Sequence, residues 1–265
     1  MSNPPASRNS GKPPVVVVLT AGGFNPWMII NHLAPVYPGL QVIEEQPESK
    51  SVLLRRRVRR FGWLNAAGQL ATMALSKFGK RFADTRIHAI AREYGLSGEP
   101  DGTILRHRVE SANSDACRAL LAGINPDVVV TVSCRILDRA TLSAIPCPVI
   151  NLHSGINPAY RGQMGGYWAL VNGDTRNFGA TVHLVDAGVD TGETLAEIRA
   201  TPAKGDSFLT YPTLLTAISA TALSRAVADV LAGEVRSHAP EGPSRLWFNV
   251  PVWTWLRHGL TKGIW

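Results

Sequence analysis

The sequence predicts an α/β fold: a doubly wound, mostly parallel sheet flanked by helices, which is a Rossmann-like arrangement. Three uninterrupted apolar runs predict its central strands: "VVVVLTAGGF" from Val15, "DVVVTVS" from Asp127 and "PVINLH" from Pro148. Runs of this kind, rich in β-branched residues, are typical of strands buried on both faces of a parallel sheet. Segments with helical spacing alternate with them, as expected of strand–helix–strand crossovers.

The first half of the chain follows this alternation. The first strand ends at Gly22-Gly23, and "NPWMIINHLA" follows as a helix with Asn25 as its N-cap and Pro26 in its first turn. "LQVIEEQ" is expected to form a second strand, and the chain from Lys50 to Tyr94 is expected to be helical and basic. "TILRHRV" reads as a short strand and "SDACRALLAGI" as the helix after it.

The second half adds shorter elements and one long helix. "RILDRATLSAI" is expected to be a short helix, and "GGYWALVNGD" a helix stopped by Asn172-Gly173. "GATVHLVD" alternates as a strand with Thr181, His183 and Val185 on one face. "YPTLLTAISATALSRAVADVLAGE" is a long amphipathic helix that ends at Gly233. No apolar run is expected to be long enough to span a bilayer.

Charge and cysteine content bound the partners and the compartment. The 265 residues carry a net charge of +7 and a pI near 9.7, which favours an anionic partner. The run "RRRVRR" from Arg55 to Arg60 supplies much of the excess, and such a run is more often a solvated helix face than a binding site. Cys117, Cys134 and Cys147 form no CxxC pair, so neither a disulfide framework nor a zinc site is indicated. We expect them to be buried and reduced, as in a cytoplasmic protein.

Polar side chains gather where the predicted strands end, which is where open α/β sheets bind their ligands. Asn151 and His153 are two apart on one strand, so they project from the same face. The later segment "TVHLVDAGVDTGE" offers Asp186 and Asp190 on a glycine-punctuated loop. A carboxylate beside an imidazole favours its protonated form, and an amide with an imidazolium stabilises an oxyanion. These groups suit acyl transfer to an external nucleophile.

Three segments together resemble the 10-formyltetrahydrofolate-dependent formyltransferase family: "NLHSGINPAYRG", the helix "YWALVNGD" and "GATVHLVDAGVDTGE". The family includes methionyl-tRNA formyltransferase, glycinamide ribonucleotide formyltransferase and the sugar N-formyltransferases. The resemblance covers Pro126 to Glu197 well, and Val15 to Leu33 more loosely. It implies 10-formyltetrahydrofolate as co-substrate and requires no metal.

The resemblance implies roles for matching residues. Asn151, His153 and Asp190 match the catalytic trio, in which the first two bind the formyl oxygen and the carboxylate orients the imidazole. His183 matches a second histidine of some members, and a plain packing role for it is equally expected. The backbone groups of Arg135, Ile136 and Leu137 would hydrogen-bond the edge of the pterin ring. The loop that contains Asp186 and Gly188 would close the other side of the folate slot.

Two further segments are expected to contact the acceptor. Gly23, Phe24 and Asn25 match a glycine-rich loop that holds a phosphate at a helix N-terminus in the purine-pathway relatives, although Gly-Gly before a helix is also simply a tight turn. Tyr160 and Arg161 lie in the loop over the site.

The chain also departs from the family, and the departures bear on the acceptor. The loop "SGINPAYRG" has Gly155, Ile156 and Asn157 where many members have two leucines and a proline. Only about 70 residues follow Leu195, little room for the C-terminal barrel of methionyl-tRNA formyltransferase, so no tRNA substrate is expected. The favoured acceptor is an anionic small molecule, the amino group of a nucleotide-linked amino sugar. A glycinamide ribonucleotide formyltransferase-like enzyme, a 10-formyltetrahydrofolate hydrolase and a non-catalytic basic binding module remain alternatives.

The expected organisation has three parts. Residues 1–13 form a disordered tail, residues 14–200 the formyltransferase catalytic domain with a basic helical insert at about 50–95, and residues 201–265 a helix and a Trp-rich extension. The extension holds four of the seven tryptophans. Packing on the domain or across a homodimer is its favoured role, and base stacking or interfacial membrane anchoring are the alternatives.

Overall fold

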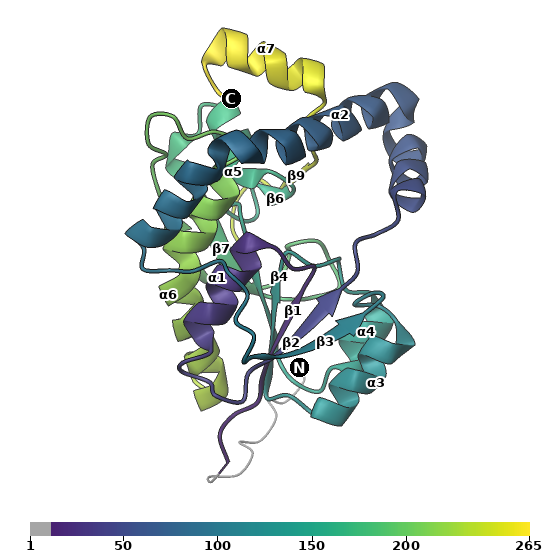
Figure 1. Ribbon diagram of the computed structural model, residues 1–265, viewed down its shortest axis with the longest axis vertical. Coiled ribbons are helices and arrows are strands. Elements are labelled where there is room, and N and C mark those ends of the chain that lie inside the picture. The colour runs from purple at the N-terminus through teal and green to yellow at the C-terminus, as the bar shows by residue number, and fades with distance from the viewer. Residues whose placement is uncertain (1–11) are drawn as a thin grey trace.

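Seven strands form one sheet in the order β3-β2-β1-β4-β5-β7-β8 in the computed structural model, which describes residues 12–265 (Figure 1). The five strands from β3 to β5 are parallel, and β7 runs antiparallel to both of its neighbours. The strands are β1 Val16–Thr20, β2 Gln41–Glu45, β3 Leu105–Val109, β4 Val128–Val132, β5 Val149–His153, β7 Gly179–Leu184 and β8 Thr194–Arg199. The predicted mostly parallel α/β fold is confirmed. Residues 1–11 of the predicted tail lie outside the described residues.

Helices cover both faces of the sheet. The helices are α1 Phe24–Leu33, α2 Lys50–Glu93, α3 Asp115–Ile124, α4 Arg139–Ala144, α5 Gly165–Val171, α6 Tyr211–Ala232 and α7 Val252–Lys262, with a 3-10 turn at Thr175–Asn177. Alternate residues of β1 enter two separate cores. Val16 and Val18 pack with α1, α6 and the end of α2, whereas Val17 and Leu19 pack with α3 and α4. A β-branched run buried on both faces is therefore what this central position requires.

The order of the strands reverses beside β1. The chain builds outward from β1 to β2 and β3, then returns to the other side of β1 with β4. Doubly wound sheets commonly bind their ligands at such a reversal, but here the Ala21 N–H bonds the Ser133 carbonyl (3.1 Å) just beyond β1 and β4, and the pocket lies at the ends of β4 and β5. A short parallel pair, β6 Arg161–Gly162 with β9 Leu246–Trp247, lies beyond the end of β5.

Two helices begin elsewhere than the sequence pattern predicts. Helix α1 starts at Phe24 with Gly23 as its N-cap, so Asn25 lies inside the first turn and its side chain accepts a hydrogen bond from Thr213 (2.8 Å). Helix α4 starts only at Arg139, because the Asp138 carboxylate accepts the backbone N–H of Thr141 and caps the helix there. Residues 135–138 are consequently a loop, and not the first turn of a helix.

Helix α6 has the length and mean hydropathy (22 residues, 1.5) of a membrane span, the only helix among residues 12–265 that does. The expectation that no apolar run reaches that length was therefore wrong. Its apolar residues, Leu215 and Leu223 among them, belong to the core cluster that also holds β1 and β4. Burial against the sheet accounts for its composition, as in a core helix. The boundary predicted at residue 200 stays a prediction.

Helix α2 is 44 residues long and is bent at Gly62, which has φ 76° and ψ 162°. The part before Gly62 rises from the end of β2, and the part after it crosses the top of the molecule beside α7 (Figure 1). A non-glycine residue is strongly disfavoured at this φ, so Gly62 allows the change of direction.

The bend gives a prediction about two exposed glycines. Gly62→Ala should lower the free energy of unfolding by about 1–2 kcal/mol, because its backbone conformation is costly for a residue with a Cβ. Gly123→Ala is the matched control: Gly123 lies within α3 without a positive φ, and a Cβ there would meet open space. This change should add about 0.5–1 kcal/mol through helix propensity. Urea denaturation followed by tryptophan fluorescence measures both, and equal effects of the two changes would contradict the assigned bend.

Candidate active site

A pocket of about 490 Å³ opens at the carboxyl ends of β4 and β5. Nine of the residues predicted from the sequence line it: Asn151, His153, His183, Asp190, Arg135, Ile136, Leu137, Asp186 and Gly188. The structure thus brings together the candidate catalytic groups and the two walls expected for a folate slot.

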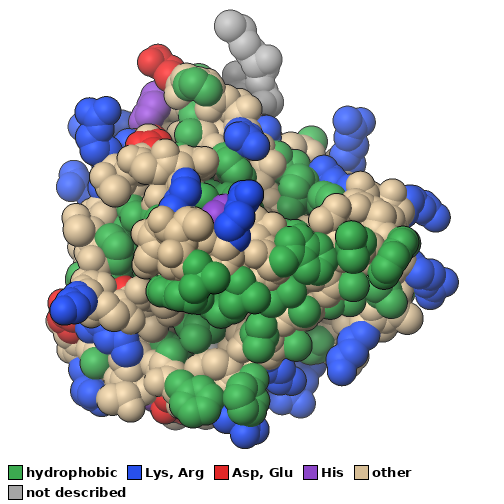
Figure 2. Space-filling model, turned by 90° about the horizontal axis from the view of Figure 1, so that it is seen from above, with side chains coloured by type: hydrophobic (Ala, Val, Ile, Leu, Met, Phe, Trp, Pro, Cys, Tyr) green, Lys and Arg blue, Asp and Glu red, His purple; other side chains and the backbone are tan. Residues whose placement is uncertain are grey.

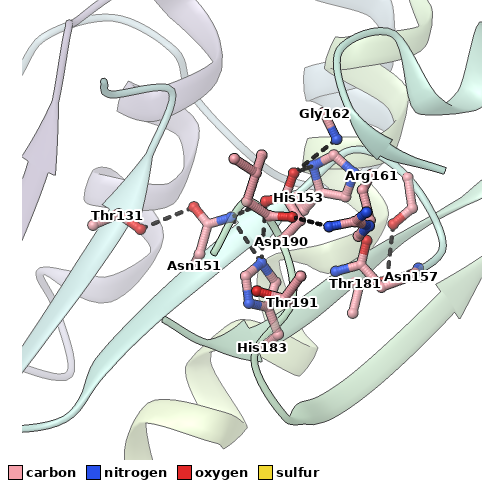
Figure 3. Close-up of polar contacts among 12 residues, drawn as sticks. Thr131, Asn151, His153, Asn157, Arg161, Gly162, Thr181, His183, Asp190 and Thr191 are labelled. Carbon is pink, nitrogen blue, oxygen red and sulfur yellow. Dashed lines mark hydrogen bonds and ion pairs between the residues drawn. The ribbon is translucent and has the colours of Figure 1, made fainter. Parts of the chain in front are cut away.

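Asn151 is held in one orientation by the strand beside it. Thr131 on β4 lies directly opposite Asn151 in the parallel register, and its hydroxyl donates to the Asn151 Oδ1 atom (2.9 Å). The Asn151 Nδ2 group therefore points the other way, toward His183 and Asp190 (Figure 3). A fixed amide N–H aimed into a pocket is a donor suited to an oxyanion.

His183 faces Asn151 across the antiparallel pair of β5 and β7. Its Nδ1 atom lies 2.8 Å from the Leu184 carbonyl oxygen, so Nδ1 carries the proton and donates. The Nε2 atom of the neutral ring then has the lone pair, which accepts from Asn151 Nδ2 (3.0 Å). The same atom is 3.4 Å from Asp190 Oδ1, so a proton taken up by Nε2 would meet a carboxylate.

His153 is buried (7% exposed) and has an acceptor on each side. Its Nε2 atom donates to the Tyr160 carbonyl oxygen (2.7 Å), and its Nδ1 atom lies 3.5 Å from Asp190 Oδ2. Only the imidazolium, with a proton on each nitrogen, satisfies both acceptors. The predicted pairing of His153 with Asp190 is present, but His153 can reach a formyl oxygen only if Nε2–H leaves Tyr160.

Asp190 joins these groups into one network. Burial raises its pKa, but the positive charge of His153, the proximity of His183 and the N–H of Gly162 outweigh burial and lower the pKa from 3.8 to about 2. The Gly162 N–H lies 2.8 Å from Asp190 Oδ2. Asp190 is therefore a carboxylate throughout the neutral range.

The segment Tyr160–Gly162 supports this network, and of its three residues Gly162 lines the pocket. The Tyr160 carbonyl accepts from His153, and the Arg161 guanidinium donates to the Val189 carbonyl (3.0 Å). The Gly162 N–H donates to the Asp190 carboxylate. The Tyr160 hydroxyl donates to Asp174, and its ring stacks near Trp247. Neither Tyr160 nor Arg161 lines the pocket, and their predicted contact with a substrate stays untested.

The backbone at Arg135, Ile136 and Leu137 forms one wall of the pocket. The Arg135 N–H is taken by the Glu45 carboxylate (2.6 Å) and the Ile136 carbonyl by the Asn113 amide (2.9 Å). These two bonds hold the loop in place. The Ile136 side chain is 63% exposed, whereas the Leu137 side chain is buried in the core.

The opposite wall is the turn from Asp186 to Asp190. The Asp186 carboxylate accepts from the Gly188 N–H (2.9 Å) and the Thr191 hydroxyl (2.6 Å), which closes the turn on itself. A Cβ at Gly188 would collide with Thr191, so the turn depends on glycine here. Asp190 follows with a φ of 50°, a conformation in which Asp is tolerated.

The glycine-rich loop after β1 does not reach the pocket. Gly23, Phe24 and Asn25 are absent from its lining, and Phe24 packs edge-on against His88. The Glu44 carboxylate lies against Gly22, where it would repel a phosphate.

Sequence reasoning missed two residues that hold the site. Thr131 is the one polar residue within the apolar strand β4, and its polarity was the feature of the sequence that could have identified it as a site residue. Glu45 is buried at the end of β2 and accepts from the backbone of both Ala112 and Arg135. Within residues 12–265, no three His, Cys, Asp or Glu side chains are grouped to hold a metal ion.

The Asp190 network predicts a pH-dependent stability. The lowered pKa means that ionised Asp190 contributes stability above about pH 4, and that this contribution is lost as the pH falls toward 2. A shift from 3.8 to about 2 corresponds to about 2 kcal/mol. Asp190→Asn should therefore lower the free energy of unfolding by about 2 kcal/mol at pH 7, with the deficit shrinking below pH 4.

Urea titrations at several pH values measure this deficit, with the exposed Asp84→Asn as control. A deficit that does not change with pH would show that Asp190 stabilises the fold through packing and not through its charge.

Comparisons with known proteins identify the family of the chain. The profile of the formyl transferase family matches residues 87–226, more than half of the chain. Methionyl-tRNA formyltransferase of Desulfotalea psychrophila is 29% identical over 164 residues, which are 62% of this chain and 48% of that protein. The chain thus spans about half the length of this curated relative.

Solved structures share the fold at low identity. Glycinamide ribonucleotide transformylase 1 from Symbiobacterium toebii aligns with a TM-score of 0.57 at 19% identity, over 89% of this chain and 100% of that one. WlaRD, a sugar 3N-formyl transferase crystallised with dTDP and 5-N-formyl-THF, aligns with a TM-score of 0.55 at 11% identity, over 89% and 70%. The profile match, together with this architecture, shows that the chain belongs to the formyl transferase family.

Proposed function

We propose that the protein transfers a formyl group from 10-formyltetrahydrofolate to a primary amine. The observation that carries the proposal is the convergence of the Asn151 amide, two imidazoles and the Asp190 carboxylate on one wall of a pocket. The same pocket is bounded by the loop at residues 135–137 and the turn at residues 186–190, as a bicyclic pterin would require.

Each group has a role in such a transfer. The amine nitrogen attacks the formyl carbon, and the Asn151 Nδ2–H stabilises the negative charge that develops on the formyl oxygen. As the Asn151 Nδ2–H turns from His183 to the formyl oxygen, the lone pair on His183 Nε2 becomes free to take the proton released by the amine, and Asp190 stabilises the resulting imidazolium. Collapse of the intermediate breaks the bond from the formyl carbon to N10 of the folate, and the His183 imidazolium returns its proton to N10 as tetrahydrofolate leaves.

The amino group of a nucleotide-linked amino sugar remains our proposed acceptor. Relatives of the same fold include a sugar formyltransferase crystallised with a nucleoside diphosphate. A glycinamide ribonucleotide would instead place its phosphate on the loop after β1, where the Glu44 carboxylate lies against Gly22. The methionyl-tRNA formyltransferase relatives make methionyl-tRNA the second candidate acceptor to be tested.

The acceptor is identified by incubating the protein with 10-formyltetrahydrofolate and a panel of amines. The panel contains nucleoside-diphosphate amino sugars, glycinamide ribonucleotide and methionyl-tRNA, and one sample contains no amine. We expect tetrahydrofolate to form only with an amino sugar nucleotide. Release of tetrahydrofolate without any amine would identify a hydrolase and overturn the transferase proposal. Release only with glycinamide ribonucleotide or methionyl-tRNA would overturn the proposed amino-sugar acceptor.

The mechanism predicts a large effect of Asn151→Ala. Loss of one oxyanion donor should lower kcat by about 100- to 1,000-fold, because that bond is strongest in the transition state. Asn65→Ala is the matched control: Asn65 is exposed on α2 and bonds only within its own helix (3.2 Å to the Phe61 carbonyl). Steady-state kinetics and circular dichroism measure activity and folding. A correctly folded Asn151→Ala variant with near-native kcat would remove Asn151 from the mechanism.

A further inference from the structure

Between Gly62 and Phe82, helix α2 presents most of its large apolar residues to the outside, whereas Ile87 and Ile90 nearer its end are buried. Leu64, Leu75, Phe78 and Phe82 recur at helical spacing along one face, and all are exposed, Phe82 to 79%. The face that packs inward is polar or small instead, with Gln69 and Thr72 buried. This distribution is the reverse of that on a helix that covers a core in water.

Close packing explains the inner face. Gly68 lies against the Trp253 indole and Gly79 against Leu209, where a Cβ would collide or be tightly crowded. The buried Gln69 accepts a hydrogen bond from Arg57 (2.9 Å). These contacts hold the helix close to the body of the protein, and they direct the leucine and phenylalanine side chains outward.

Helix α7 lies beside α2 and extends the same surface. Trp253, Leu256 and Leu260 are three and four residues apart, and all are exposed, Leu260 to 79%. Figure 2 looks down on this side of the molecule and shows hydrophobic side chains across it, with Lys and Arg around much of its edge. We call the exposed apolar residues of these two helices the α2–α7 face.

The charges within the two chain segments that form this face have one sign, and the exposed Asp84 is the first acid to follow on α2. Residues 50–83 contain nine Lys or Arg and no Asp or Glu, and residues 252–265 contain Arg257 and Lys262 and no acid. Arg55, Arg59 and Arg81 are exposed. Aromatic and aliphatic side chains ringed by Lys and Arg are the composition of helices that lie in the interface of an anionic bilayer.

We propose that the α2–α7 face docks on an anionic lipid surface. The leucine, phenylalanine and tryptophan side chains enter the boundary between headgroups and acyl chains, and the surrounding cations contact the lipid phosphates. A second copy of the chain fits this face less well, because a symmetric dimer would bring like charges together with no carboxylate in either helical segment to pair with them. The proposal is independent of the acceptor of the formyl group.

The test is co-sedimentation of the full chain with vesicles of phosphatidylcholine containing about one third phosphatidylglycerol. Leu64→Ser should weaken binding about tenfold, because a leucine that would enter the bilayer is replaced by a polar residue. Leu105→Ser is the matched control. Leu64 and Leu105 are each 56% exposed, but Leu105 is the first residue of the edge strand β3 and is not part of the α2–α7 face. The control should bind as the parent protein does.

Three further measurements complete the test. Arg59→Gln with Arg81→Gln should weaken binding and reduce its dependence on salt. Circular dichroism should show all variants folded, since every changed side chain is exposed. The proposal is overturned if the parent protein does not bind these vesicles at low salt, or if Leu64→Ser and Leu105→Ser bind equally. It is also overturned if ultracentrifugation shows a dimer that Leu64→Ser dissociates, because the face would then be a subunit interface.

Discussion

The buried carboxylate of Asp190 is the interaction on which the rest of the site depends. It lies within 3.5 Å of two imidazoles and accepts the Gly162 N–H, so three chain segments meet at one side chain. A carboxylate taken out of water needs such partners, because burial alone would raise its pKa. The same contacts fix the donors and lone pairs of both histidines. The contacts of Asp190 are therefore needed both for the stability of the fold and for the proposed catalysis.

The shared face of Asn151 and His153 could be predicted from the sequence, because residues two apart on a strand project to the same side. The place of Asp190 beside them was expected from the resemblance to the formyltransferase family, since β7, which precedes Asp190, runs antiparallel to β5. The Tyr160 partner of His153 could not be predicted in either way. The His153 Nε2 atom bonds a backbone carbonyl seven residues later, and only the course of the loop brings that carbonyl into place. The Thr131 bond similarly depends on the register between two strands.

Helix boundaries and helix faces show a second limit of sequence patterns. The pattern after β4 predicted a helix from residue 135, but the Arg135 N–H is taken by Glu45, a residue ninety positions earlier. Along α2, apolar spacing would ordinarily mark the buried face. Here glycines allow the opposite face to approach Trp253 and Leu209 closely, so tertiary packing decides which side faces the core.

The pocket and the α2–α7 face share structural elements, so the position of one constrains the other. Tyr167 lines the pocket, and its hydroxyl bonds His258 on the inner side of α7 (2.8 Å). Burial lowers the His258 pKa, so the neutral ring accepts this hydrogen bond. Asn249 also lines the pocket, while its neighbour Phe248 packs against Phe61 of α2 (ring centroids 4.9 Å). Docking through the outer sides of these helices would therefore hold the pocket at a set height and angle to the lipid surface, without any residue of the Asp190 network touching lipid.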